Sequence, residues 1–181
     1  MLERLSEKFA GKLISTGIIS ETDAEIYVYG FFQTVMLVLN VATTLFLGII
    51  FQMIIPCNLL NLAYIPIRIS AGGHHADSPV KCYINSTFMI AVLLAIIKWI
   101  PVHHVVSIIL LVVSSVVIWI LAPVETENNP LDEVEVCVYR RRTKIVLAIE
   151  LAVICLCFIT AKYQMAVTII LGLFTESIML L

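Results

Sequence analysis

The chain has 181 residues, of which 61% are hydrophobic and 13% are charged, and its formal net charge at pH 7 is −2. Soluble domains have about 25% charged residues, so this composition excludes an ordinary soluble fold, and the small negative charge implies no general attraction to nucleic acid. The hydrophobic residues occur in long runs that do not alternate with polar residues, which excludes a β-barrel and predicts an all-α, polytopic membrane protein.

The first predicted element is an amphipathic helix within residues 1–20. Leu2, Leu5, Phe9 and Leu13 fall near one face of such a helix, and most of the charged residues fall on the other face. This pattern is typical of a helix that lies on a membrane surface, and equally of a solvated helix that packs on its own protein. Because charges run through the whole segment, it is not a cleavable signal peptide.

About six hydrophobic helical segments follow, and the second is the weakest of them. It begins near Leu59, after a predicted break at Pro56 and Asn58, and it contains Pro66 and Arg68. Such a segment is typical of a kinked or re-entrant element, which is tolerated only where protein covers its backbone. The six segments are predicted to end, in order, near Gln52, Ser70, Ile100, Ala122, Ala161 and the last residue.

The longest polar stretch, residues 123–142, is predicted to be a cytoplasmic loop between the fourth and fifth segments. No clear internal repeat divides the sequence, so we expect residues 1–181 to form a single membrane-embedded domain. Two acidic residues, Glu150 and Glu176, fall deep in the fifth and sixth segments, where a charge is costly.

The distribution of lysine and arginine predicts the orientation in the membrane. With six crossings and the N-terminus inside, every Lys and Arg except Lys98 and Lys162 falls on the same side. Cytoplasmic loops carry the excess of positive charge. We therefore expect a multi-pass protein of the cell membrane with both termini, and residues 72–82, at the cytoplasmic face.

Residues 72–82 lie between two apolar segments and contain two histidines and a cysteine, which are side chains capable of chemistry. Gly72 and Gly73 are suited to positive φ angles at the end of a helix, and Pro79 is suited to the first position of the next helix. Cys82 then falls in the first turn, where the helix dipole favours an anion. His75 and Cys82 could form a base–nucleophile pair.

Spacing limits that pairing. Two residues seven apart in an unbroken helix are separated by about 10.5 Å along the axis, whereas direct proton transfer requires about 3 Å. The pairing of His75 with Cys82 therefore requires the segment before Pro79 to fold back over the start of the helix. Asp77 could orient His75, but it could equally cap the helix.

Other interpretations of these residues remain open. His and Cys side chains can simply pack or contact lipid headgroups, or His74, His75 and Cys82 could bind a metal ion. No second cysteine stands at a short ligand spacing, and His103 and His104 are predicted at the opposite face, so we expect no metal or other cofactor. The remaining cysteines form no disulfide framework, and Cys155 and Cys157 are predicted to be packing residues.

At Arg68, Gly72-Gly73-His74-His75 and Cys82 the chain resembles the accessory gene regulator B (AgrB) family, which are membrane peptidases of Gram-positive quorum sensing. The resemblance extends to length, hydropathy and the amphipathic N-terminus. It implies that Cys82 is the nucleophile and His75 its partner, that His74 is at a variable position, and that Arg68 and Gly73 are important. In one departure, residues 127–129 are Glu-Asn-Asn where relatives often have lysines.

The resemblance implies a cysteine endopeptidase formed by the whole chain. It would remove the C-terminal tail of an AgrD-like precursor peptide and, through a thioester with the enzyme, promote cyclisation to a thiolactone or lactone. The implied partners are this precursor, membrane lipid and a second copy of the chain, with no nucleic acid. Arg68, Arg140, Arg141 and Arg142 could hold an acidic tail, although the last three could simply set topology.

Two other classes of function are compatible with the sequence. A small transporter or metal-binding membrane protein would be expected to show internal repeats and charges deep in its spans, and only the second feature is present, as Glu150 and Glu176. A structural membrane protein without chemistry is the third interpretation.

Overall fold

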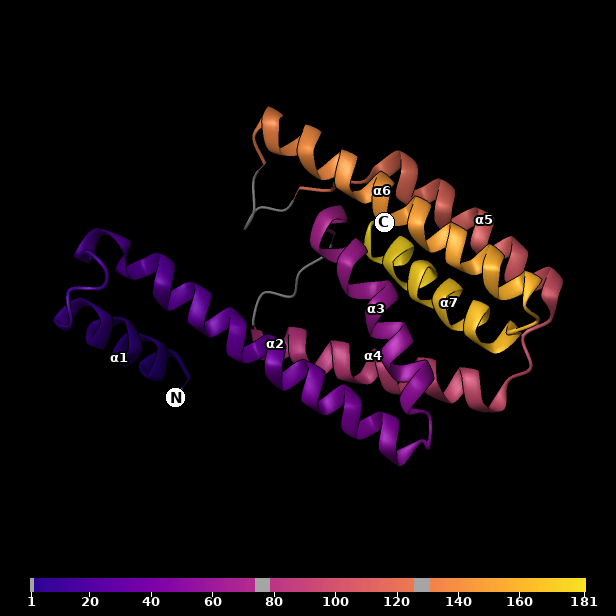
Figure 1. The fold of residues 1–181 in the computed structure, drawn as a ribbon, viewed down its shortest axis with the longest axis horizontal. Coiled ribbons are helices and arrows are strands. Elements are labelled where there is room, and N and C mark those ends of the chain that lie inside the picture. Colours follow the sequence, from indigo (N-terminus) through magenta and orange to yellow (C-terminus); the bar gives the residue numbers. More distant parts are fainter. Residues whose placement is uncertain (1, 74–78, 126–130) are drawn as a thin grey trace. The chain divides into compact units, whose positions relative to one another are not determined.

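The computed structural model describes residues 2–73, 79–125 and 131–181, and every regular element in these ranges is a helix (Figure 1). The predicted all-α class is confirmed. The elements are α1 (Leu2–Ser15), the short 3-10 helix η1 (Glu21–Asp23), α2 (Ala24–Ile50), α3 (Ile54–Ala71), α4 (Pro79–Trp99), α5 (His104–Leu121), α6 (Glu133–Ile159) and α7 (Tyr163–Met179).

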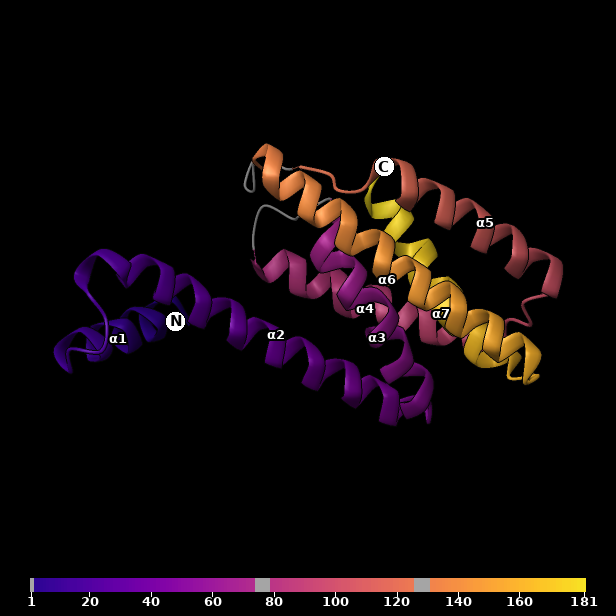
Figure 2. The same ribbon diagram turned by 45° about the horizontal axis from the view of Figure 1, so that its top comes forward.

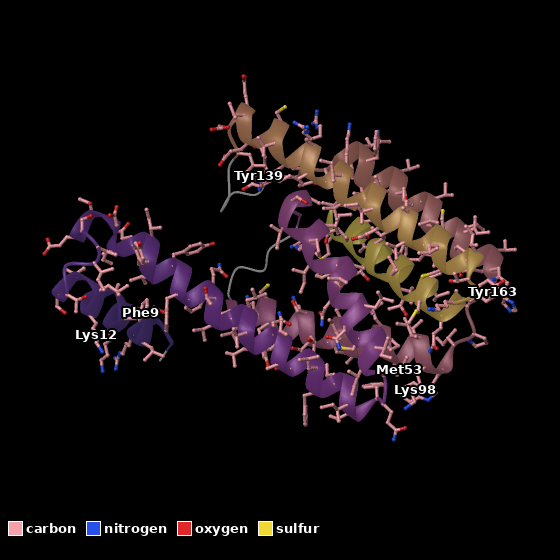
Figure 3. All side chains as sticks on the ribbon, in the orientation of Figure 1. Phe9, Lys12, Met53, Lys98, Tyr139 and Tyr163 are labelled. Atoms are coloured by element: carbon pink, nitrogen blue, oxygen red, sulfur yellow. The ribbon has the colours of Figure 1, made fainter. Side chains whose placement is uncertain are left out.

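The chain forms two compact units, Met1–Thr44 and Leu45–Leu181. In the first unit, the amphipathic helix α1 packs against the early part of α2. The rings of Phe9 and Phe31 are stacked with their centroids 4.4 Å apart. Figure 3 shows Phe9 between these helices and Lys12 away from α2. Ser6 and Ala10 of α1 are buried, whereas Leu5 and Phe9 on its apolar face are 52% and 40% exposed.

The second unit is built around α7. This helix packs most extensively on α3 and α5, and also on α6 and α4. Figures 1 and 2 both show it enclosed by the longer helices. Because α7 is apolar on nearly all sides, it has to be covered by other helices or by lipid. Ten of its residues are buried: Ala166, Thr168, Ile169, Ile170, Leu171, Gly172, Leu173, Thr175, Glu176 and Ser177.

Four helical segments of the described chain are long and apolar enough to cross a membrane: Glu21–Ile50, Ile54–Ala71, Val80–Trp99 and His104–Leu121. Helix α7 is apolar but shorter, and the apolar part of α6 begins only after Lys144. These helices make the chain a membrane protein, and about six hydrophobic segments are present.

The second hydrophobic segment is longer than the sequence suggests, and it is long and apolar enough to cross a membrane. Helix α3 has 18 residues, and the chain breaks at residues 51–53, where Gln52 has a φ of 58°. The predicted break at Pro56 is wrong because Pro56 lies in the first turn of α3. A proline there removes no intrahelical hydrogen bond, since the first N–H groups of a helix have no such partner.

The second half of the predicted loop 123–142 is also helical, because α6 begins at Glu133. Asp132 caps this helix: its Oδ1 atom accepts a hydrogen bond of 2.6 Å from Glu135 N–H, and Asp132 N–H donates to the Glu135 carboxylate at 3.1 Å. This reciprocal pair satisfies two backbone donors and allows a helix to start among polar residues.

One end of the second unit, which we call the Lys98 end, contains residues 51–53, 98–104 and 160–163. The Lys98 Nζ atom donates a hydrogen bond of 2.8 Å to the Phe51 carbonyl, and the rings of His104 and Tyr163 lie 4.5 Å apart. Figure 3 labels Met53 and Lys98 close together at this end. The connections from α2 to α3, α4 to α5 and α6 to α7 therefore all lie at the Lys98 end.

The opposite end, which we call the Gly72 end, contains the last turn of α3, the first turn of α4, residues 121–125 and the last turn of α7. Gly72 forms an isolated parallel bridge with Val124, which joins α3 to the segment after α5. Arg68, Gly72 and Gly73, which the sequence singles out, thus lie at the end of the helix bundle away from Lys98 and Lys162.

Candidate functional site

The two glycines at the end of α3 form the centre of the Gly72 end. Their φ angles are 75° for Gly72 and 100° for Gly73, which confirms the predicted positive values. The Gly72 N–H donates to the Arg68 carbonyl at 3.2 Å in the last hydrogen bond of the helix, which ends where φ becomes positive. Other residues adopt such angles only at a cost in steric strain, so this backbone conformation favours glycine.

This Gly72–Gly73 turn is also tightly enclosed. The Val124 N–H donates to the Ala71 carbonyl at 2.9 Å. A Cβ atom added to Gly73 would lie 2.6 Å from Arg68 Nη1 and 2.7 Å from the Met179 carbonyl oxygen. Helix α3, the segment after α5 and the end of α7 therefore meet around a turn that has no room for a side chain.

Arg68 connects the turn to α7. Its Nη1 atom donates a hydrogen bond of 2.6 Å to the Gly72 carbonyl and lies 3.7 Å from Glu176 Oε1 in an ion pair. The Arg68 side chain is 15% exposed and that of Glu176 is fully buried. Because Arg68 is engaged with groups of its own chain, its position favours support of the turn over direct contact with a substrate.

Cys82 is the fourth residue of α4, as the sequence predicts, and its thiol is free and partly buried. The N–H groups of this first turn have no intrahelical partner, so they can stabilise negative charge. Cys82 lies within electrostatic range of Tyr64 on α3. The Tyr64 hydroxyl donates to the Met179 sulfur at 3.2 Å and so joins α3 to α7.

Several predicted features lie outside the described residues. They are His74, His75, Asp77, the cap residue Ser78 and the loop residues 127–129. The pairing of His75 with Cys82 therefore stays a prediction. In the ranges that the structure describes, no three His, Cys, Asp or Glu side chains are placed so that they could hold a metal ion.

The three consecutive arginines lie on the polar first part of α6, and all three are exposed. Successive residues of a helix point about 100° apart, so they form a broad positive surface rather than one binding face. The Arg142 guanidinium lies 6.0 Å from the ring centroid of Tyr139, which Figure 3 labels on this part of α6. The cluster is thus available to an acidic partner outside the helix bundle.

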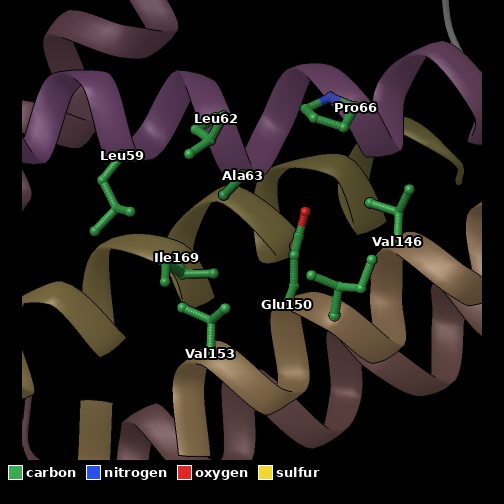
Figure 4. Close-up of a pocket in the computed structure, with 9 residues that line it drawn as sticks. Leu59, Leu62, Ala63, Pro66, Val146, Glu150, Val153 and Ile169 are labelled. Carbon is green, nitrogen blue, oxygen red and sulfur yellow. The ribbon is translucent and has the colours of Figure 1, made fainter. Parts of the chain in front are cut away.

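A groove of about 350 Å³ lies between α3 and α6, with Ile169 of α7 in its wall (Figure 4). Its lining is apolar except for Glu150, which extends from α6 toward α3 and is 7% exposed. Neither Glu150 carboxylate oxygen has a hydrogen-bond partner among the described residues. The other lining residues are Leu59, Leu62, Ala63, Pro66, Val146, Ile149 and Val153.

The sequence did not predict that Glu176 pairs with Arg68, or that Cys155 and Cys157 differ in exposure. A signal for Glu176 was present, because a carboxylate and Arg68 fall at the same depth in apolar helices, where each needs a partner. Cys157 is buried, as predicted, but Cys155 is exposed. Residues two apart in a helix point about 200° apart, so both cannot face the same core.

The family model described as Accessory gene regulator B matches residues 6–180, which include the Gly72 end and all of α3–α7. The chain belongs to the accessory gene regulator B family. Similar proteins include those named accessory gene regulator protein B in Staphylococcus aureus strains Newman, USA300 and COL. Each is 32% identical over 123 residues, which are 68% of this chain and 63% of the relative.

No solved structure matches the chain.

A Gly73→Ala substitution tests the enclosure of the turn. We expect it to lower the free energy of unfolding by about 1–3 kcal/mol, because alanine at a positive φ is strained and its Cβ meets Arg68 and Met179. Thermal unfolding in detergent measures the change. The control is Gly30→Ala, where no atom lies within 4 Å of the new Cβ. Equal midpoints for the two variants would contradict this account of the turn.

A Glu150→Leu substitution tests the cost of the buried carboxyl group. We expect the free energy of unfolding to rise by about 1–3 kcal/mol, since a buried polar group without a partner is replaced by a side chain suited to the groove. Cys155→Leu, on the exposed side of the same helix, is the control for added apolar surface. The interpretation fails if Glu150→Leu unfolds at the same temperature as the parent or below it.

Proposed function

We propose that this chain is a membrane cysteine endopeptidase that removes the C-terminal tail of a quorum-sensing precursor peptide and promotes its cyclisation. The observation that carries the proposal is the position of Cys82, a free and partly buried thiol in the first turn of α4. The constrained Gly72–Gly73 turn, from which the chain continues to His75, lies at the same end of the bundle. Family membership supports the same role.

The first half of the reaction breaks a peptide bond. His75 takes the proton of the Cys82 thiol, and the thiolate attacks a carbonyl carbon of the precursor. The C–N bond then breaks, the tail leaves as an amine that receives the proton from His75, and a thioester joins the precursor to Cys82. N–H groups of the first turn of α4 are suited to stabilise the oxyanion that forms before the bond breaks.

The second half closes the ring. A cysteine or serine within the precursor gives its proton to His75 and attacks the thioester carbonyl, so Cys82 leaves as a thiolate and recovers the proton. A cysteine gives a thiolactone and a serine gives a lactone. A thiol is suited to this exchange because one thioester replaces another of similar free energy, whereas forming a thioester from a free carboxylate would be uphill.

The orientation follows from the charges at the two ends of the helix bundle. Lys81 and Arg140–Arg142 belong to the parts of the chain near the Gly72 end, whereas Lys98 and Lys162 belong to the Lys98 end. Under the positive-inside rule the Gly72 end is cytoplasmic. The precursor would reach Cys82 from the inner leaflet, with its acidic tail near Arg140–Arg142. The homodimer that the resemblance implies stays a prediction.

Paired substitutions at neighbouring residues test the catalytic roles. We expect Cys82→Ala and His75→Ala each to abolish cleavage of the precursor, because one removes the nucleophile and the other its base. We expect His74→Ala and Cys155→Ala, which change the same residue types elsewhere, to keep it. Cleavage is followed by mass spectrometry, and the parent enzyme should yield an adduct at Cys82 that free thiol releases. Cleavage by Cys82→Ala would end the proposal.

The arginine cluster can be tested through KM. Replacing Arg140, Arg141 and Arg142 together by Gln should raise the KM for a precursor with an acidic tail by roughly three- to tenfold, since each exposed ion pair contributes less than about 1 kcal/mol. A precursor whose tail carboxylates are amides should show no such rise. Labelling of the exposed Cys137 by a membrane-impermeant maleimide checks that the orientation is unchanged. An equal rise in KM for both precursors would contradict a role in holding the tail.

A further inference from the structure

Glu176 is the charged residue that the proposed reaction leaves unused. It lies on the enclosed helix α7, its side chain is fully buried, and the residues around it in the sequence are mostly apolar. Burying a charge inside a membrane protein costs free energy unless the charge is paired. Charged residues at such positions usually have a function. Its observed partner is Arg68, with 3.7 Å between Arg68 Nη1 and Glu176 Oε1.

The same nitrogen of Arg68 contacts the glycine turn. Nη1 donates to the Gly72 carbonyl at 2.6 Å, and it lies 2.6 Å from the position that a Cβ atom on Gly73 would take. The carboxylate on α7, the guanidinium on α3 and the backbone of the turn therefore form a continuous series of contacts. A shift of the guanidinium away from Glu176 would also move the donor that holds the Gly72 carbonyl.

We propose that Glu176 is a positioning residue that, through Arg68, fixes the Gly72–Gly73 turn in the conformation from which the chain continues to His75. The proposal rests on the proposed function. Glu176 touches no reacting atom; it holds the guanidinium, the guanidinium holds the Gly72 carbonyl, and the positive φ angles of the two glycines set the direction of the chain. The effect on catalysis is therefore on the placement of the base.

The groups around the ion pair supply a matched control. Tyr64 on α3 and Glu150 on α6 lie within electrostatic range of Glu176, and Tyr64 is also within range of Cys82 on α4. Glu150 is likewise a buried carboxyl group in an apolar helix, but it lines the groove rather than the turn, and no ion pair joins it to Arg68 among the described contacts. Glu150→Gln thus changes a buried carboxyl group that lies outside the series of contacts from Glu176 through Arg68 to the turn.

The central test is Glu176→Gln in the full chain, reconstituted in lipid nanodiscs. We expect kcat for precursor cleavage to fall by roughly 100-fold, which is the typical result of a small displacement of a catalytic group, with KM little changed. Glu176→Asp keeps the carboxylate and should be intermediate. Glu150→Gln should retain the parent kcat and KM.

A second readout separates positioning from general support of the fold. The rate of Cys82 alkylation by iodoacetamide, followed by mass spectrometry as a function of pH, reports on the base beside the thiol. We expect the pH profile of Glu176→Gln to move toward that of His75→Ala, and the profile of Glu150→Gln to match the parent. A parent-like profile for a folded Glu176→Gln variant would overturn the proposal, because a purely structural ion pair would leave the profile in place.

A double variant covers the case in which Glu176→Gln, by removing the carboxylate that pairs with the Arg68 charge, fails to fold. Arg68→Met with Glu176→Met removes both charges together, and apolar replacement of a complete buried pair is usually tolerated. It should elute and unfold like the parent, yet show the same loss of kcat. Parent-like kcat and pH profile in this variant would overturn the proposal. Cleavage by Cys82→Ala, measured alongside, would instead show that the proposed function itself is wrong.

Discussion

The ion pair between Arg68 and Glu176 is the interaction on which the Gly72 end depends. Two opposite charges inside an apolar helix bundle attract strongly because little water screens them, and each would be heavily penalised alone. The pair thus links α3 to α7 beside the Gly72–Gly73 turn. Helix α7, which carries Glu176, packs on α3, α5 and α6. The ion pair therefore connects the turn to the helix at the centre of the second unit.

The positive φ angles of Gly72 and Gly73 set the direction in which the backbone leaves α3. The Gly72 carbonyl has a fixed donor in Arg68, and Val124 N–H holds the preceding carbonyl of Ala71. The end of α3 is therefore held from both sides, in a conformation that only glycine adopts without strain. A turn that is defined so closely is suited to present a following side chain in a reproducible place, which catalysis by a base requires.

The sequence predicted the helices well where local chemistry decides their limits. Pro79 begins α4 and α5 ends before Ala122, because proline and the loss of the apolar run act locally. It failed at Pro56, since a proline in a first turn does not break a helix, and it could not foresee the positive φ at Gln52, a residue type without a preference for that conformation. Asp132 and Glu135 carry a capping pattern that places the start of α6 within the polar stretch.

For the candidate site, spacing in the sequence placed Cys82 and both glycines correctly but could not reveal what holds them. The pairing of Arg68 with Glu176 joins residues from α3 and α7, so no local pattern encodes it. Only the cost of charge in apolar helices points to it. Glu150 shows the limit of that reasoning, because it satisfies the same criterion and yet lines a groove without a hydrogen-bond partner in the described part of the chain.

Helix length has a consequence for the depth of the site. Helix α3 has 18 residues, or about 27 Å, which is slightly less than the roughly 30 Å of a bilayer's hydrocarbon core. If α3 crosses the core along the membrane normal, both of its ends lie close to the limits of the core, and so does the turn that follows it. Under the proposed function, limited access of water at that level would give an internal nucleophile of the bound peptide time to reach an acyl group on the Cys82 sulfur before hydrolysis does.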